Sequence, residues 1–128
     1  MYTFARYRVG ETFGPCDITL GPELLAQWDA TFPDAAAQNE AIPPGLLSVI
    51  TMRAYGSLIA PRPPGNIHAG LGFDIIRLPS RGETISLRFA CAEKAIRRDR
   101  KFVDLIFECR DGDGAALFSG RFTSIVAQ

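Results

Sequence analysis

The chain has 128 residues, with 14 basic and 14 acidic side chains and a formal net charge of zero. This length predicts a single domain, residues 1–128, that can bury its own core. The charge balance argues against a general nucleic-acid binder, whose basic excess would show in the composition, and leaves little repulsion between copies of the chain.

Three cysteines, Cys16, Cys91 and Cys109, are widely spaced and odd in number. We therefore expect free thiols in a reducing cytoplasm. The N-terminus has no long apolar run that would indicate a signal peptide, and no apolar stretch is long enough to predict a membrane partner. With one histidine, scattered cysteines and no phosphate-binding glycine loop, neither a metal site nor a cofactor is expected.

The first segments give weak signals. Residues 4–9 alternate loosely and predict an edge strand, residues 10–15 predict a turn-rich link, and residues 16–20 a short extended piece. A helix follows, with Gly21 as its cap and Pro22 at its first position, where a missing N–H costs nothing.

That first helix is predicted to end at Phe32-Pro33-Asp34, because the residue before a proline avoids the helical region. Its members at helical spacing form one apolar face. They are Leu24, Leu25, Trp28 and Phe32.

A second, longer helix is predicted for residues 44–59, opened by Pro43-Pro44-Gly45. It is apolar on nearly every side, so other elements must enclose it. Arg53 is its only charged residue, and a charge on an apolar helix needs an ion-pair partner or a polar environment. Arg53 is expected either to pair with a carboxylate of a second copy or to project into a ligand tunnel.

Strand patterns fill the rest of the chain, separated by clear turn signals. The strands are expected at residues 67–78, 83–93, 101–110 and 115–127. One enclosed helix followed by these strands predicts an α+β fold, an antiparallel sheet wrapped around a long central helix.

Three motifs of this chain occur in the order Phe32-Pro33-Asp34, Ile42-Pro43-Pro44-Gly45-Leu46-Leu47 and Leu78-Pro79-Ser80-Arg81-Gly82-Glu83-Thr84-Ile85. Together they resemble the MaoC-like hydratases and dehydratases of the hot-dog fold, over essentially the whole chain. The resemblance implies a homodimer whose sheets join, with an acyl-CoA or acyl-carrier-protein thioester bound at the subunit boundary. It also implies that a backbone N–H at the start of the central helix holds the thioester carbonyl.

The family's hydratase motif, Asp-x-Asn-Pro-x-His, is not intact here. The corresponding stretch runs from Asp34 to Asn39, so that Asp34 fits the place of the Asp and Asn39 stands where the His belongs. Ile50 stands where the carrier-protein dehydratases have a Glu. Asp34 either orders a water or is a turn residue after proline. Asn39 either holds a water or carbonyl, or is a polar loop residue.

His68 is the only histidine, placed where the strand after the central helix should begin. Histidine titrates near neutral pH, so one interpretation makes it the group that moves the α-proton of an acyl thioester. The other is a histidine that packs and hydrogen-bonds a neighbouring backbone group. Gly70 beside it would leave room for a ligand.

The predicted helix start offers two substrate-binding amides. Gly45 and Leu46 would present unpaired N–H groups at the positive end of the helix dipole. Such donors stabilise a developing enolate oxygen, unless water or a nearby side chain satisfies them. The basic turn at residues 97–101 either grips the phosphates of coenzyme A or is a solvated hairpin tip.

The sequence thus favours an enzyme that adds or removes water at the β-carbon of a 2-enoyl or 3-hydroxyacyl thioester. Its catalytic candidates are His68, Asp34 and Asn39. Its substrate-binding candidates are Gly45, Leu46, Arg53 and Gly70. The alternatives are a non-catalytic acyl-thioester binder, or a subunit of a larger assembly, and a thioesterase.

Overall fold

The computed structural model describes residues 1–33 and 40–128. The elements of these residues follow one another along the chain as β1 (Thr12–Thr19), α1 (Pro22–Thr31), α3 (Leu46–Leu58), β2 (Ile67–Ile75), β3 (Thr84–Arg97), β4 (Arg100–Arg110) and β5 (Ala116–Val126).

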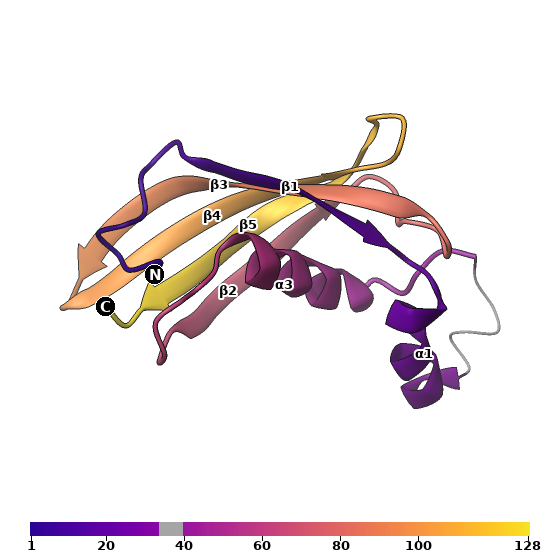
Figure 1. The fold of residues 1–128 in the computed structure, drawn as a ribbon, viewed down its shortest axis with the longest axis horizontal. Helices are drawn as coiled ribbons and strands as arrows, with labels where there is room; N and C mark the ends of the chain where they lie inside the picture. The colour runs from indigo at the N-terminus through magenta and orange to yellow at the C-terminus, as the bar shows by residue number, and fades with distance from the viewer. Residues whose placement is uncertain (34–39) are drawn as a thin grey trace.

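The strands form one antiparallel five-stranded sheet in the order β1-β3-β4-β5-β2. Figure 1 shows a curved sheet with α3 on its concave side and α1 beyond one end. β1 and β2 are the two edges of the sheet. This arrangement confirms the predicted α+β fold, an antiparallel sheet around a central helix.

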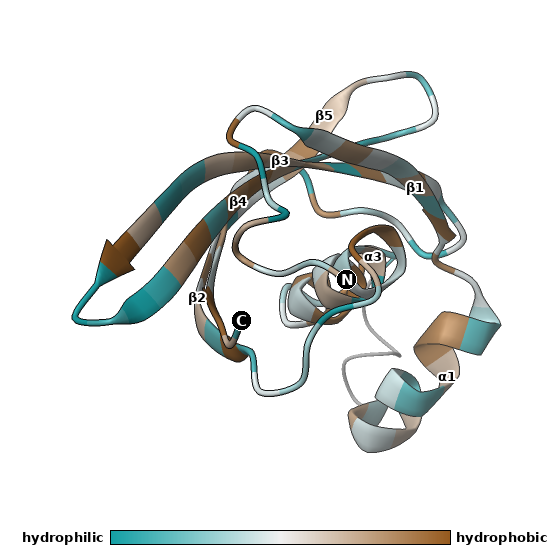
Figure 2. Cartoon of the chain, turned by 60° about the vertical axis from the view of Figure 1, so that its left-hand side comes forward, coloured by the Kyte–Doolittle hydropathy of each residue, from teal (hydrophilic) through white to brown (hydrophobic). Residues whose placement is uncertain are grey.

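The core lies between the concave face and α3. Buried side chains alternate with exposed ones along β3 and β4, as expected for a sheet with one covered face, and Figure 2 shows this alternation as bands along the strands. The helix contributes Leu46, Leu47, Ile50, Ala54 and Tyr55. A stripe of Val49, Arg53 and Ser57, spaced four apart, stays exposed, so the chain encloses α3 on all sides but one.

The element bounds agree with the sequence patterns except near the turns. α3 begins at Leu46, two residues later than predicted, and β2 ends at Ile75 rather than residue 78. β3 extends to Arg97, four residues beyond its predicted end. It does so because Arg98 and Asp99, with φ of 50° and 64°, form a two-residue hairpin turn that matches the twist of long strands.

Two of the N-terminal predictions were wrong, whereas the extended piece predicted at residues 16–20 is confirmed as far as Thr19, the end of β1. Residues 4–9 form turns and irregular backbone rather than a strand, and residues 12–15 belong to β1 instead of a link. A bulge explains β1: Phe13 pairs with Phe89 and Cys16 with Leu87, so two residues of β1 oppose one of β3. Pro15 is tolerated there because β1 is an edge strand.

Candidate functional site

The start of α3 is built by a tight proline turn. Gly45 is the N-cap residue. The Leu46 N–H donates to the Pro43 carbonyl at 3.0 Å, and the Leu47 N–H to the Pro44 carbonyl at 3.1 Å. The Leu46 amide is therefore occupied, which corrects the expectation that it is unpaired. The Gly45 N–H has no acceptor among the described residues.

Trp28 of α1 lies directly over this turn. A Cβ placed on Gly45 would come within 3.1 Å of Trp28 Cη2 and 3.5 Å of Cζ2. The indole also packs against Phe32, with ring centroids 4.8 Å apart. Trp28 Nε1 is buried and has no hydrogen-bond partner in the part of the chain that is described. The sequence predicts Trp28 only as part of the apolar face of a helix. Its being the single tryptophan of the chain was the one feature that set it apart from the other residues of that face.

An ion pair fixes α1 beside the start of α3. Arg81 donates two hydrogen bonds to the Asp29 carboxylate, at 2.7 and 2.8 Å. The Arg81 guanidinium holds the pKa of Asp29 below its ordinary value, chiefly through these hydrogen bonds. Ala41 pairs with Ser80 in an isolated bridge. Two motifs separated in the sequence, residues 42–47 and 78–85, are thus joined in space.

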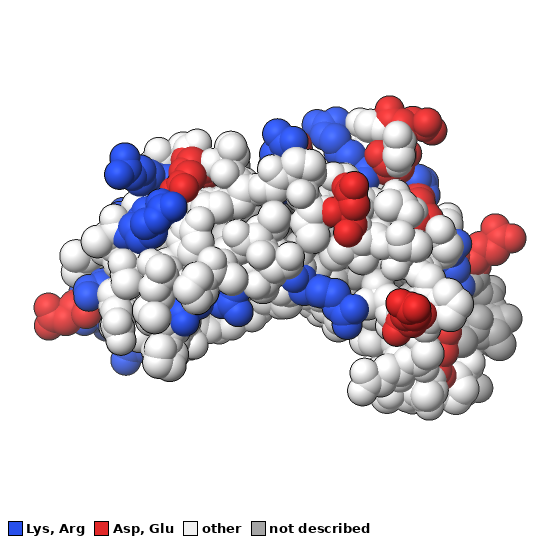
Figure 3. Space-filling view, in the orientation of Figure 1, with Lys and Arg blue, Asp and Glu red and all other residues white. Residues whose placement is uncertain are grey.

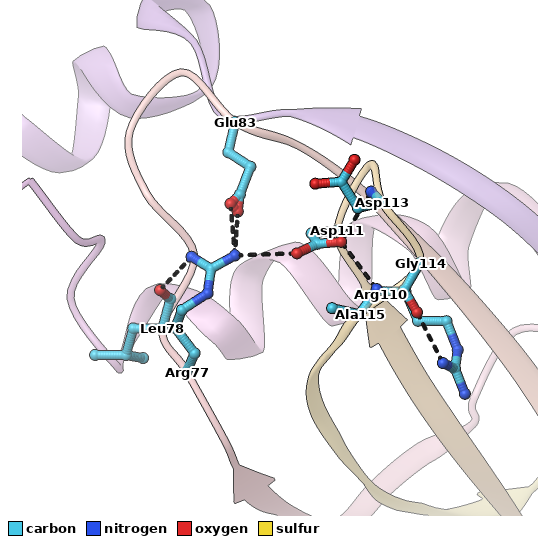
Figure 4. Close-up of polar contacts among 8 residues, drawn as sticks. All are labelled: Arg77, Leu78, Glu83, Arg110, Asp111, Asp113, Gly114 and Ala115. Atoms are coloured by element: carbon cyan, nitrogen blue, oxygen red, sulfur yellow. Dashed lines mark hydrogen bonds and ion pairs between the residues drawn. The ribbon is translucent and has the colours of Figure 1, made fainter.

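A second charged network fastens the end of β2 to the neighbouring turns. Figure 4 shows the Arg77 guanidinium between two carboxylates: Glu83, at 3.0 and 3.1 Å, and Asp111, at 3.4 Å. Hydrogen bonds from the backbone N–H groups of Ala115 and Asp113, and from Arg77, lower the pKa of Asp111. This network joins the turns around β2.

His68 is the second residue of β2 and is exposed. Its ring stands edge-on to Phe122 at 4.7 Å, and Phe122 contacts Tyr55 of α3 at 4.8 Å. His68 therefore lies on the concave face. The strand has a register shift between His68 and Gly70, so that Gly70 pairs with Thr123 and faces the opposite side of the sheet from His68. A Cβ added to Gly70 would be 3.9 Å from the Thr123 Cβ.

The structure does not bring His68 and Gly45 together within one chain. Figure 1 shows α3 beginning on the α1 side and ending near the connector from which β2 starts. Thirteen helical residues span about 20 Å, so the two candidates lie at opposite ends of α3. Arg53 is exposed partway along it, and no residue of 1–33 or 40–128 forms an ion pair with it. Asp34 and Asn39 lie outside the described residues.

Charge is unevenly distributed despite the zero net charge. The β3–β4 turn carries Arg97, Arg98, Arg100 and Lys101 against one Asp99, and Figure 3 shows basic side chains gathered toward that end and acidic ones toward the α1 end. A hollow of about 320 Å³ lies beside this turn, lined in part by Arg100, Lys101 and Ile67.

Another hollow and the buried thiol of Cys109 lie away from these candidates. A trough of about 730 Å³, lined by Arg88, Glu108 and Arg121 among others, opens on the sheet face away from α3. Burial raises the pKa of the Cys109 thiol to about 12, as expected of an unreactive core cysteine. Among the described residues, no group of three His, Cys, Asp or Glu side chains is placed to hold a metal ion, and no helix could cross a membrane.

No family model and no curated protein sequence matches the chain. Solved structures do. A MaoC-like dehydratase from Rhodospirillum rubrum has 16% identity and a TM-score of 0.80, over 98% of this chain and 97% of that one. The R-hydratase PhaJ1 from Pseudomonas aeruginosa has 18% identity and a TM-score of 0.73, over 97% and 84%.

A mutant of the fluoroacetyl-CoA-specific thioesterase FlK has 19% identity and a TM-score of 0.71, over 93% of this chain and 87% of that one. At such identities the likeness establishes the fold. The chain therefore has the hot-dog fold, in the form also found in MaoC-like dehydratases and R-hydratases.

Proposed function

We propose that the protein is an acyl-thioester hydratase or dehydratase, which adds or removes water at the β-carbon of a 2-enoyl or 3-hydroxyacyl thioester of coenzyme A. The observation that carries this proposal is the start of α3 in a hot-dog fold, where the Gly45 N–H has no described acceptor and sits at the positive end of a helix. An N–H so placed stabilises negative charge on a thioester oxygen.

The proposed site needs two copies of the chain. Among the residues that the structure describes, β2 is an edge strand that pairs with β5 alone, and an open edge is a template for another strand. Two copies related by a twofold axis pair such strands antiparallel. β2 runs back toward the side where α3 begins (Figure 1), so the start of the second copy's β2, with its His68, approaches the Gly45 of the first copy.

In this dimer, His68 of the second copy acts as the proton shuttle, while Asp34 or Asn39 orders the attacking water. Glutamine keeps hydrogen-bonding capacity but carries no titratable group, so His68→Gln abolishes hydration of crotonyl-CoA, followed by loss of the enoyl absorbance. The matched control is Asp113→Asn at an exposed turn, which leaves the rate unchanged. Full activity of the His68→Gln variant would show that His68 does not transfer the proton.

A mixing experiment tests the shared site. Gly45→Pro removes the N–H at a residue whose φ of −61° already suits proline, although Trp28 must shift slightly, because its Cη2 would lie 3.1 Å from the new Cβ. Neither this variant nor His68→Gln is active alone. Equal mixing of refolded subunits restores about a quarter of the wild-type rate, because half the dimers are mixed and each has one intact site. No recovery would mean that the two residues do not act across an interface.

Two other functions remain distinguishable by product. The FlK likeness favours thioester hydrolysis as a second candidate, and release of free thiol from acyl-CoA would support it. Binding of acyl-CoA with neither water addition nor thiol release would instead identify a non-catalytic binder, consistent with Asn39 in place of the family's histidine.

A further inference from the structure

The strongly basic β3–β4 turn lies beside the strand that carries His68. Arg98, Arg100 and Lys101 form no ion pair with any residue of 1–33 or 40–128. Asp99 is the only acidic residue of the turn. Cations held close together repel one another, and a bound anion relieves that repulsion. The turn is therefore suited to a negatively charged ligand.

Two of these cations line a hollow. The hollow, of about 320 Å³, is bounded by the β3–β4 turn, the start of β2 and the end of β5. Arg100 and Lys101 lie in its wall with Asp99, and apolar residues such as Ile67 and Ile125 complete it. Its volume is near the lower limit of ligand-binding clefts, about 300 Å³. The hollow is thus large enough for the charged end of a ligand, with the remainder outside.

The walls of this hollow are held by contacts that do not involve the cations. The Ala127 N–H donates to the side-chain oxygen of Asn66 at 2.9 Å, which joins the end of β5 to the connector before β2. Gly65, with φ of 91°, brings that connector close to β5, because a Cβ on it would lie 3.5 Å from the Ala127 Cβ. A ligand that enters a preformed hollow does not have to order its walls, which favours binding.

The register of the sheet fixes the distance from His68 to this hollow. His68 pairs with Ser124, and Lys101 pairs with Val126. Ser124 and Val126 are two residues apart on β5 and share a face, so His68 and Lys101 both lie on the concave face. They are two strands and two residues apart, or about 12 Å. The pantetheine arm that joins a thioester to its first phosphate is as long as about four extended residues, roughly 13–14 Å.

We propose, on the basis of the hydratase function above, that this hollow binds the phosphate groups of coenzyme A through Arg100 and Lys101. Guanidinium groups bind phosphate through two parallel hydrogen bonds, and lysine binds it as a point charge. In the proposed dimer, one copy then supplies both His68 and the phosphate site, while the other supplies Gly45. Recessed cations are more accessible to a small phosphate group than to carboxylates fixed on an acidic carrier protein, which favours coenzyme A as the carrier.

Free coenzyme A and pantetheine, which lacks the phosphates, test the site without any turnover. Calorimetry should give a Kd for coenzyme A at least about tenfold below that for pantetheine, with a smaller difference at high salt. In the Arg100→Gln/Lys101→Gln variant, the Kd for coenzyme A should rise about tenfold. The matched control is Arg88→Gln, at an exposed arginine between two buried residues of β3 that face the core, and it should bind coenzyme A as wild type does. No preference of the wild type for coenzyme A, or unchanged binding by the double variant, would overturn the proposal.

Turnover separates this proposal from the hydratase function. The double variant should raise KM for crotonyl-CoA about tenfold and leave kcat unchanged, because the phosphates are held equally in the ground and transition states. Hydration of crotonyl-pantetheine should not change. If the double variant impaired only an acidic carrier-protein thioester, the turn would belong to a protein partner and the proposal would be overturned.

A protein that binds coenzyme A through Arg100 and Lys101 but hydrates neither substrate would refute only the proposed function. Should the double variant fail to fold by circular dichroism, the comparison of coenzyme A with pantetheine on the wild type decides alone.

Discussion

Gly120 of β5 occupies a position that no other residue fits. A Cβ there would collide with the Gly72 carbonyl oxygen of β2 and come within 2.5 Å of Phe107 Cζ. Phe107 is almost fully buried and cannot swing outward. Gly120→Ala must therefore displace both the aromatic core and the strand that carries His68. Gly72 is the matched control, because a Cβ on it meets no atom within 4 Å.

The magnitude follows from three terms. Overpacking a core aromatic costs about 1–3 kcal/mol, and separating β2 from β5 at one ladder hydrogen bond costs about 1 kcal/mol. Replacing glycine in a strand returns about 0.5–1 kcal/mol. Gly120→Ala is thus destabilising by about 1–3.5 kcal/mol, whereas Gly72→Ala is neutral or stabilising by up to about 1 kcal/mol.

Urea unfolding at one fixed protein concentration measures both variants. With a slope of about 1.5 kcal/mol per M, the two midpoints should differ by about 2 M, and the Gly120→Ala protein should be the less stable one. Because β2 is the strand displaced, Gly120→Ala should also weaken the proposed dimer, as measured by light scattering. Two midpoints separated by less than about 0.3 M would refute the packing argument.

Two further predictions concern titratable groups. Asp29 has a folded-state pKa below its unfolded value because Arg81 hydrogen-bonds it, so its stabilising contribution is complete above pH ~4 and is lost as the pH falls through the folded value. Asp29→Asn should make urea stability less dependent on pH below ~4, and an unchanged acid profile would contradict this. Burial raises the pKa of the Cys109 thiol. Iodoacetamide at mildly alkaline pH should therefore alkylate the half-buried Cys16 in the folded protein and leave Cys109 unmodified. Peptide mapping that finds Cys109 alkylated would contradict this prediction.

The C-terminal strands could be predicted because their signals are local. Turn residues at 97–100 and 111–114 separate strands that pair with their neighbours in the sequence. The first half of β1, residues 12–15, could not be predicted, because Gly14 and Pro15 normally interrupt a strand. The bulge that accommodates them depends on β3: the Leu87 carbonyl lies 2.9 Å from the position of a Gly14 Cβ. That contact joins residues more than seventy positions apart.

The candidate site could be predicted only where its signals are local in the sequence. A proline-glycine motif located the start of α3, but whether the Leu46 amide is free depends on how the Pro43 carbonyl turns, which residue types do not reveal. The contact of Trp28 with Gly45 is tertiary and has no sequence pattern. The separation of Gly45 and His68 could be predicted, because the helix expected at residues 44–59 lies between them.

The two edges of the sheet are unlike, and this limits how far assembly can proceed. β1 contains Pro15, which has no N–H to offer a neighbouring strand, and a bulge that disrupts its ladder. β2 contains no proline. In the dimer proposed above, the β1 strands would face outward, where Pro15 and the bulge disfavour the addition of a further strand. Pro15, which broke the strand pattern in the sequence, would then also protect the proposed pair from open-ended growth into a fibre.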